Sequence, residues 1–157
     1  MICVVDKNNK IINIINADSP TRENERICYP WCSLWEQYTD IEPLWYAKQR
    51  KTAEFKARRD SQEVAPIEYN GHSYDYDSKA RERINAAIIA LDQQGADADI
   101  AWTTADDNDV TVTAADLRAV IAAVAMRSNA LHVKYRTLKH QVQECKTTEE
   151  LEAIKWE

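Results

Sequence analysis

The feature that most constrains the fold is a long apolar seam in the C-terminal half of the chain. Its members recur at alternating spacings of four and three residues, which is the period of a helix packed against another helix. They are Leu117, Ile121, Val124, Ser128, Leu131, Tyr135, Leu138 and Val142. Thr113 and Asp116 resemble a capping box, with Asp in place of the usual Glu or Gln. The pattern predicts one long helix that begins at this box and continues for about four heptads.

A seam of this length needs a partner, and the chain offers a shorter helix. Residues 78–94 have one apolar face, with Asp77 or Ser78 placed to cap the first turn and Gly95 placed to end the last. That face consists of Ile84, Ile88 and Leu91. Two interpretations follow: the seam packs on this face within the chain, or its C-terminal half stays exposed and mediates self-association. The candidate partner contacts of that half are Leu131, Tyr135, Leu138 and Val142.

Two β-hairpins complete the predicted C-terminal domain. The pair Asn70-Gly71 lies between alternating residues and favours a tight turn, because both positions must take positive φ. Residues 100–103 and 110–113 are strand-like on either side of a polar turn. With the two helices, these hairpins predict an α+β domain over residues 65–157.

The N-terminal part, residues 1–45, predicts a small β module with an aromatic loop. Its first seventeen residues have β-branched runs on both sides of a polar turn and predict a hairpin. A two-stranded ribbon is marginal by itself in water, so it must pack on something. Trp31 and Trp35 lie in the loop that follows. They form either the local core of this module or a contact surface for a partner.

Residues 46–64 between these parts predict a basic connecting helix. Lys and Arg outnumber acidic residues there, and apolar positions are sparse. We expect an exposed helix with a solvated face, the alternative being that its charge docks on the acidic C-terminal part or on a neighbouring molecule. The predicted class is thus α+β: an N-terminal β-hairpin module, this helix, and a domain of two short hairpins and a helical hairpin.

Few residues of the sequence suit cofactor or metal chemistry. The two glycines exclude a P-loop and a dinucleotide-binding fingerprint, both of which need several glycines next to phosphate. The cysteines (Cys3, Cys28, Cys32 and Cys145) are scattered, and we expect free thiols. Cys28 and Cys32 are spaced like half of a zinc site, but the second half is missing nearby and His72 is the only distant candidate. We therefore expect no metal site and no cofactor.

Catalytic residues do not assemble in the sequence either. His132 and His140 lie eight residues apart in the predicted long helix, and no serine or cysteine with an orienting acid stands out around them. Cys145 would need His140 to reach it before it acted as a nucleophile. The sequence favours a protein that is not an enzyme.

The net charge of −6 lies in the C-terminal part of the chain. Residues 1–64 contain ten basic and ten acidic residues, whereas residues 65–157 contain ten and sixteen. This disfavours nucleic-acid binding, which needs a basic face. The densest acidic segment, residues 97–116, is interpreted as a solvated turn followed by a helix start, with a partner-binding patch as the alternative. Its turn carboxylates are Asp106, Asp107 and Asp109.

The sequence also gives no sign of a membrane segment. No stretch approaches the roughly 18 to 20 apolar residues that span a bilayer. The N-terminus lacks the basic start and cleavage site of a signal peptide. We expect synthesis in a cytoplasm and no membrane partner.

Several separated runs carry a family resemblance over roughly residues 50–157. They are Phe55-Lys56-Ala57-Arg58-Arg59-Asp60, Pro66 to Asp77, Arg83-Ile84, Trp102-Thr103-Thr104-Ala105-Asp106, Val112 to Leu117, and Leu131-His132 with Lys134-Tyr135. In this order they resemble a domain of unassigned function similar to those at the C-terminal ends of bacteriophage and prophage tail proteins. The opening, residues 4–19, resembles the start of short phage tail proteins encoded near tail-fibre genes. Residues 28–46 replace the proline- and glutamate-rich spacer that is usual there.

The resemblance implies a non-enzymatic structural protein of a phage tail or tail fibre, which binds other tail subunits and can form a homo-oligomer. Its place would be the virion tail, after synthesis in the cytoplasm of the bacterial host. A tail-fibre assembly chaperone is one alternative. The acidic cluster of residues 97–116 supports another, an inhibitor that binds a basic host defence protein.

Overall fold

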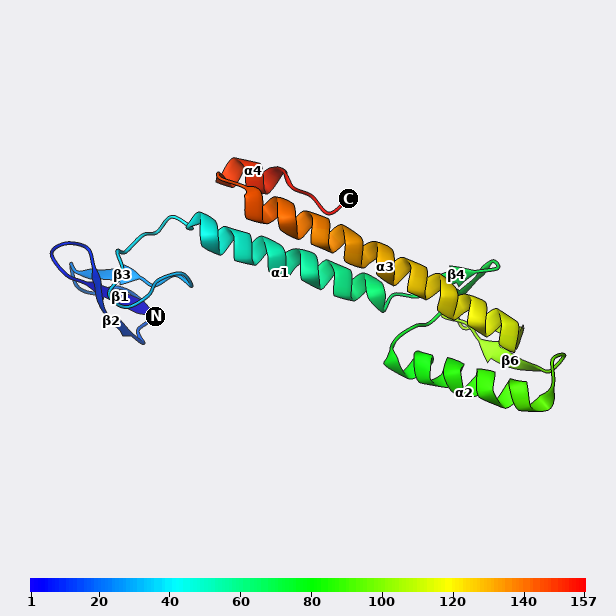
Figure 1. Ribbon diagram of the computed structural model, residues 1–157. Coiled ribbons are helices and arrows are strands. Elements are labelled where there is room, and N and C mark those ends of the chain that lie inside the picture. The colour runs from blue at the N-terminus through cyan, green and yellow to red at the C-terminus, as the bar shows by residue number, and fades with distance from the viewer. The chain divides into compact units, whose positions relative to one another are not determined.

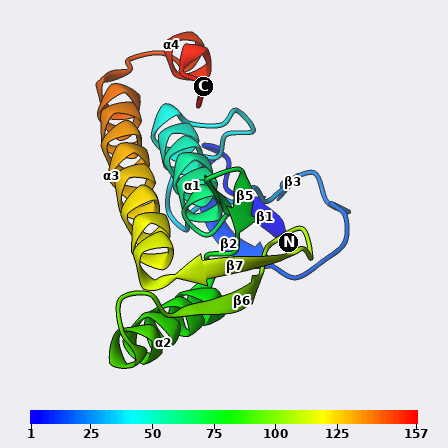
Figure 2. The ribbon, with the colours of Figure 1, turned by 90° about the vertical axis from the view of Figure 1, so that its right-hand side faces the viewer.

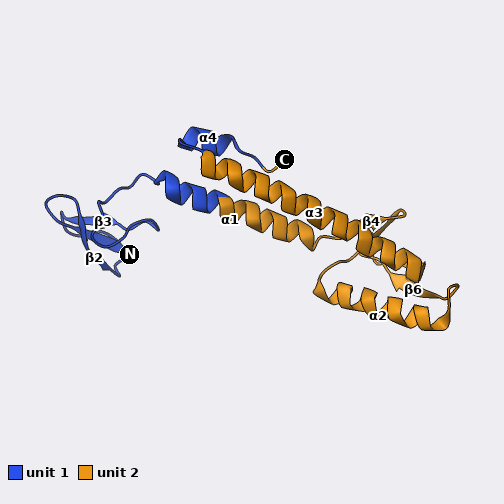
Figure 3. Cartoon of the chain, in the orientation of Figure 1, with its two compact units in different colours: residues 1–51, 145–155 blue, residues 52–144, 156–157 orange.

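The computed structural model describes residues 1–157 as two compact units (Figure 3). Unit 1 contains residues 1–51 and 145–155, and unit 2 contains residues 52–144 and 156–157. The α+β class predicted from the sequence is confirmed. No helix combines the length and the apolar character needed to cross a bilayer.

Unit 1 is built on a three-stranded antiparallel sheet in the order β2-β1-β3. The strands are β1 (Ile2–Val5), β2 (Ile11–Ile15) and β3 (Glu25–Ile27). The predicted hairpin of β1 and β2 is confirmed, and β3 is an addition on the other side of β1. Cys3 in the central strand faces Ile14 on one side and Arg26 on the other.

A buried carboxylate positions β3. Glu25 accepts hydrogen bonds from the backbone N–H of Thr21 at 2.7 Å, from the Thr21 hydroxyl at 3.2 Å and from the backbone N–H of Arg22 at 3.2 Å. These donors hold the pKa of Glu25 below its ordinary value, the Thr21 amide most strongly. Hydrogen bonds of the Glu25 carboxylate therefore help to hold this three-residue strand in place. The strand has no apolar pattern, so hydrophobic periodicity in the sequence did not predict it.

Unit 1 also contains the first turns of α1 (Leu44–Glu63) and the short helix α4 (Thr148–Ala153). Thr147 caps α4 by accepting a hydrogen bond from the backbone N–H of Glu150 at 3.2 Å. Arg50 in α1 reaches Glu152 in α4, with 3.3 Å between Nη2 and Oε1. This ion pair joins two segments that are about a hundred residues apart in the sequence.

Unit 2 joins two hairpins to two helices. Asn70 and Gly71 form the turn of the first hairpin with φ values of 50° and 79°, as the Asn-Gly pair predicted. The Thr113 amide donates to Asp116 at 2.9 Å, and the Asp116 amide donates to the Thr113 hydroxyl at 3.3 Å, so the predicted capping box is present. The elements are β4 (Ile67–Tyr69), β5 (His72–Tyr74), α2 (Ser78–Gln94), β6 (Asp99–Thr103), β7 (Asp109–Thr113) and α3 (Ala114–Glu144).

The core of unit 2 lies at the N-terminal end of α3, where α2 and the β6–β7 hairpin meet that helix (Figures 1 and 2). Asp77 caps α2 by accepting from the Ala80 amide at 2.7 Å, and the Gly95 amide donates to the Leu91 carbonyl at 3.2 Å. The buried core residues are Tyr74, Ile84, Leu91, Trp102, Val112, Leu117 and Val120. The first half of the seam therefore packs on the face of α2 that the sequence assigned to it.

Residues 52–63 of α1 pack along the later part of α3. The Arg59 guanidinium lies over the Tyr135 ring at 4.7 Å, and Ser128 donates to the Glu63 carboxylate at 3.2 Å, so the two helices run antiparallel. Phe55 is only 1% exposed. This segment has the expected solvated face, on which Lys56 and Arg58 are exposed, but its opposite face packs on α3 and the helix is not simply exposed. The apolar stripe alone did not predict this packing, because part of the contact with α3 is made by an arginine stacked on an aromatic ring.

The Phe55→Ala variant tests this packing. Removing a fully buried aromatic ring should lower the free energy of unfolding by about 3 to 5 kcal/mol. Lys56→Ala is the control, because the neighbouring side chain is 59% exposed and its loss should change stability by no more than about 0.5 kcal/mol. Urea unfolding followed by circular dichroism measures both. Equal, small effects would show that α1 is solvated along this segment.

Candidate functional site

The two tryptophans of the aromatic loop, which we define as residues 29–38, have different roles in the structure. Trp31 stacks on Tyr29 with ring centroids 4.9 Å apart and planes within 2° of parallel. Its indole N–H donates to the Thr39 carbonyl at 3.1 Å, and its ring meets the edge of Tyr46. Trp31 is therefore part of the internal packing of the loop.

Trp35 is 64% exposed and carries no such contacts for its ring. Its backbone is fixed: φ is +69°, and the amide donates to the Ile11 carbonyl of β2 at 2.7 Å. The Trp35 backbone is thus bonded to β2 while its large apolar ring faces solvent. The local-core interpretation holds for Trp31, whereas Trp35 retains the character of a contact residue.

Exposed apolar side chains concentrate in the first 45 residues. This segment has seven of the eleven large hydrophobic residues that are exposed, although it makes up less than a third of the chain. They are Met1, Ile12, Ile27, Leu34, Trp35, Ile41 and Trp45. This enrichment makes the first 45 residues the candidate segment for a partner-binding surface.

Three cysteines of unit 1 converge in space. The Sγ atoms of Cys3, Cys28 and Cys32 all lie within 4.8 Å of one another. Cys3 is fully buried in the core of the sheet with Val5 and Ile11. We call these three residues the thiol cluster. The sequence spacing pointed to Cys28 and Cys32 as a pair, and Cys3 as the third member was not predicted.

The backbone fixes each member of the thiol cluster. The Cys28 amide donates to the Met1 carbonyl at 3.1 Å, which continues the β1–β3 pairing beyond β3. The Cys32 amide donates to the Tyr29 carbonyl at 3.0 Å and closes a four-residue turn. Pro30 occupies the second position of that turn, where its fixed φ is favourable. The pairing of β3 with β1 brings Cys28 beside Cys3. Because β3 was not predicted from the sequence, the contact between these two cysteines was not predicted either.

Burial dominates the electrostatics of the thiol cluster. It raises the pKa of the Cys3 thiol well above the ordinary range, and the neighbouring thiols of Cys28 and Cys32 add to the effect. Burial also raises the pKa of Tyr38, whose hydroxyl donates to the Ile27 carbonyl at 3.1 Å. Without a compensating cation the Cys3 thiol is therefore protonated at neutral pH. A nearby cation would reverse this preference.

The acidic turn of the β6–β7 hairpin uses its carboxylates internally. Asp106 accepts from the Thr104 hydroxyl and from the side-chain amide of Asn108, each at 2.6 Å. Asp109 accepts from the Thr103 hydroxyl at 2.8 Å. Asp107 is exposed and has a φ of +59°. The solvated-turn interpretation accounts for these contacts, so two of the three predicted patch residues hold the turn together.

The second half of the α3 seam is occupied within the chain. Leu138 and Val142 are buried, while Leu131 and Tyr135 are half-buried, with Tyr135 under Arg59. From the sequence, a partner surface here was one of two interpretations, because the predicted partner helix was too short to cover this half. That reason no longer holds, because these side chains are not free.

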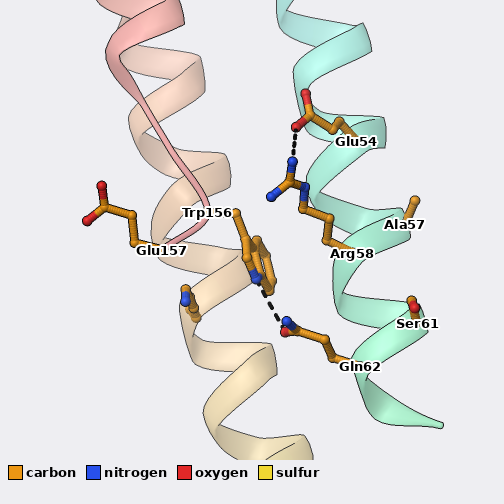
Figure 4. Close-up of a pocket in the computed structure, with 8 residues that line it drawn as sticks. Glu54, Ala57, Arg58, Ser61, Gln62, Trp156 and Glu157 are labelled. Atoms are coloured by element: carbon orange, nitrogen blue, oxygen red, sulfur yellow. Dashed lines mark hydrogen bonds and ion pairs between the residues drawn. The ribbon is translucent and has the colours of Figure 1, made fainter. Parts of the chain in front are cut away.

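A groove of about 590 Å³ lies between α1 and α3 in unit 2 (Figure 4). Trp156 projects into it, donates to Gln62 at 3.3 Å and packs at 6.0 Å from Phe55. Glu54 and Arg58 pair at 3.3 Å on its wall. Two polar pairs thus line the groove, and the Trp156 indole occupies part of it with Lys134 over its ring at 5.1 Å.

Comparison with known families identifies one match. Residues 46–155 fit the family model described as a domain of unknown function, DUF4376. The chain belongs to the DUF4376 family. Neither the curated proteins nor the solved structures gave a match.

The DUF4376 match divides the candidate features into two groups. It covers α1, the hairpins and helices of unit 2, the acidic turn and α4. The β2-β1-β3 sheet, the aromatic loop and the thiol cluster precede it. The features specific to this chain beyond its DUF4376 domain are therefore in the first 45 residues.

The Asp106→Asn variant tests the structural role of the acidic turn. Hydrogen bonds from Thr104 above all, then from Asn108 and the backbone N–H of Asp106, lower the pKa of this carboxyl. The ionised group therefore stabilises the fold above the pKa of the unfolded chain, and this contribution is lost as pH falls through the lower folded pKa. We expect Asp106→Asn to reduce thermal stability at neutral pH and to lose that acid-dependent component.

Asp107→Asn is the matched control for this experiment. It removes the same charge, and asparagine tolerates the left-handed conformation at this position. We expect it to leave the melting temperature and its pH dependence unchanged. Equal effects of the two variants would mean that the turn responds to net charge and not to the Asp106 bonds.

Proposed function

We propose that this chain is a non-enzymatic structural protein of a bacteriophage tail and binds another tail or tail-fibre subunit through its first 45 residues. It is made in the cytoplasm of the bacterial host and retained in the virion tail. The DUF4376 domain would then be the folded body that carries this binding module.

The observation that carries the proposal is the concentration of exposed apolar residues before the DUF4376 domain. Trp35 is the best candidate for an anchor, since an exposed tryptophan on a fixed backbone loses little conformational freedom on binding. Leu34 precedes Trp35, and Ile12 follows Ile11, whose carbonyl accepts the hydrogen bond from the Trp35 amide. Both side chains are also exposed. The assignment to a phage tail rests on the sequence resemblance of residues 4–19 and 55–135.

The surroundings of the histidines support a role outside catalysis. His140 shares its surface hollow with Val133, Arg136, Thr137 and Gln141, none of which is a carboxylate. The Thr137 hydroxyl donates to the Val133 carbonyl at 3.1 Å, so it is engaged in the helix. General acid–base catalysis needs a nucleophile, a base and an orienting group within reach of one another. This hollow supports no such set.

Quantitative mass spectrometry of purified virions from the source phage tests the proposal. We expect the chain in a fixed ratio to known tail subunits, because a structural protein remains in the particle. The lysate of infected cells is the reference. A chain that is abundant in the lysate and missing from particles would refute retention in the tail and favour the assembly chaperone or the host-directed inhibitor.

The Trp35→Ala variant tests the binding surface. We expect it to weaken binding to the tail subunit by at least about tenfold, which corresponds to about 1.4 kcal/mol, as for an interface anchor. Met126→Ala is the control: this side chain is 74% exposed but lies on α3. Titration calorimetry with the purified subunit measures both. Binding that Trp35→Ala leaves intact would place the interface elsewhere.

A further inference from the structure

The three sulfurs of the thiol cluster lie close enough together to ligate one metal ion. Three sulfurs bound to one zinc ion at about 2.3 Å lie about 3.8 Å apart in a tetrahedral arrangement. The Sγ atoms of Cys3, Cys28 and Cys32 lie within 4.8 Å of one another. Contraction by about 1 Å or less per pair is within reach of small side-chain rotations. The spacing of Cys28 and Cys32, with three residues between them, is also usual for zinc ligands.

The three ligands come from segments that the backbone already holds together. Cys3 lies in the central strand, Cys28 continues the β1–β3 pairing, and Cys32 ends the turn that begins at Tyr29. A site with this support loses little conformational entropy when it binds an ion.

The small size of the N-terminal sheet provides an independent reason for a metal. Its strands have four, five and three residues, and its buried core consists of Cys3, Val5 and Ile11. Modules this small are usually stabilised by a disulfide, a metal ion or a partner. The one cluster of potential metal ligands in the chain lies inside this core.

We propose that Cys3, Cys28 and Cys32 form a three-thiolate site for a divalent thiophilic ion such as Zn²⁺, with solvent in the fourth position. The Tyr38 hydroxyl adjoins this core but donates to the Ile27 carbonyl, so it is engaged elsewhere. Binding exchanges three S–H protons for three metal–sulfur bonds: one M²⁺ and three thiols give one complex of charge −1 and three protons. No electron is transferred. The site is independent of the proposed tail function.

A disulfide is the competing fate of these cysteines. It joins only two sulfurs and leaves the third as a buried thiol, and it needs an oxidant to accept two electrons and two protons. The metal site uses all three sulfurs and needs no oxidant. In the structure, no disulfide joins any of the four cysteines.

Cobalt titration of the reduced, metal-free full chain tests the proposal. Co²⁺ is the probe because thiolate ligation gives a charge-transfer absorption that Zn²⁺ lacks. We expect one Co²⁺ per chain with this absorption, and its loss when Zn²⁺ displaces the cobalt. We also expect Zn²⁺ to raise the melting temperature, since it binds the folded state. Absence of the charge-transfer band would overturn the proposal.

Single cysteine variants make the test specific. Cys32→Ser should weaken Co²⁺ binding by at least about tenfold, because it removes one thiolate at a half-buried position where serine fits. Cys145→Ser is the matched control outside the cluster and should bind as the unaltered chain does. Circular dichroism checks that both variants fold. Equal loss in the two variants, or no loss in Cys32→Ser, would contradict the assignment.

Intact mass spectrometry resolves the competing fate. Chain isolated under non-denaturing conditions should carry the mass of one bound metal ion less that of the protons it displaces, and after the metal is removed by denaturation the mass should be that of four thiols. A mass lower by two hydrogen atoms, together with no Co²⁺ binding after reduction, would show a disulfide pair and overturn the metal site.

Discussion

Packing along α3 is the interaction on which the structure of unit 2 depends. One helix of 31 residues presents a single apolar seam, and its two halves meet different partners. Leu117 and Val120 close the core with α2 and the β6–β7 hairpin, whereas Tyr135 packs under Arg59 of α1. Each partner is too short to bury the seam alone. The other elements of unit 2 therefore pack on α3, with α2 and the β6–β7 hairpin at its first half and α1 at its second half.

Local signals in the sequence predicted much of unit 2. The Asn70-Gly71 turn and the capping box of Thr113 and Asp116 each act within four residues, so the sequence alone determines them. The contacts of α1 with α3 and the pairing of β3 with β1 connect residues far apart in the chain, and neither is encoded in a simple period. Arg59 contributes packing through a ring contact, and Glu25 stabilises β3 by burying a carboxylate. Charged residues with structural roles were therefore the main source of error.

The candidate site shows the same division between local and distant information. Trp31 and Trp35 were recognisable as a pair, but only the structure separates the packed ring from the exposed one. Cys28 and Cys32 were recognisable by spacing, whereas Cys3 joins them only through β3. The acidic segment was interpreted as a solvated turn followed by a helix start, and the structure adds that the Thr104 and Asn108 side chains donate to Asp106 within that turn.

The thiol cluster and the exposed tryptophan are mechanically connected. The turn that ends at Cys32 is followed by a short segment in which the Trp35 amide bonds to β2. A metal ion on Cys3, Cys28 and Cys32 would anchor the start of this segment to the central strand, while the Trp35 bond anchors its end. With both ends fixed, the indole would be presented in one orientation, and the entropy cost of ordering it on binding would fall. In a chain whose sheet is so small, the metal would then act on affinity for a partner through the rigidity of the loop, with no contact between metal and partner.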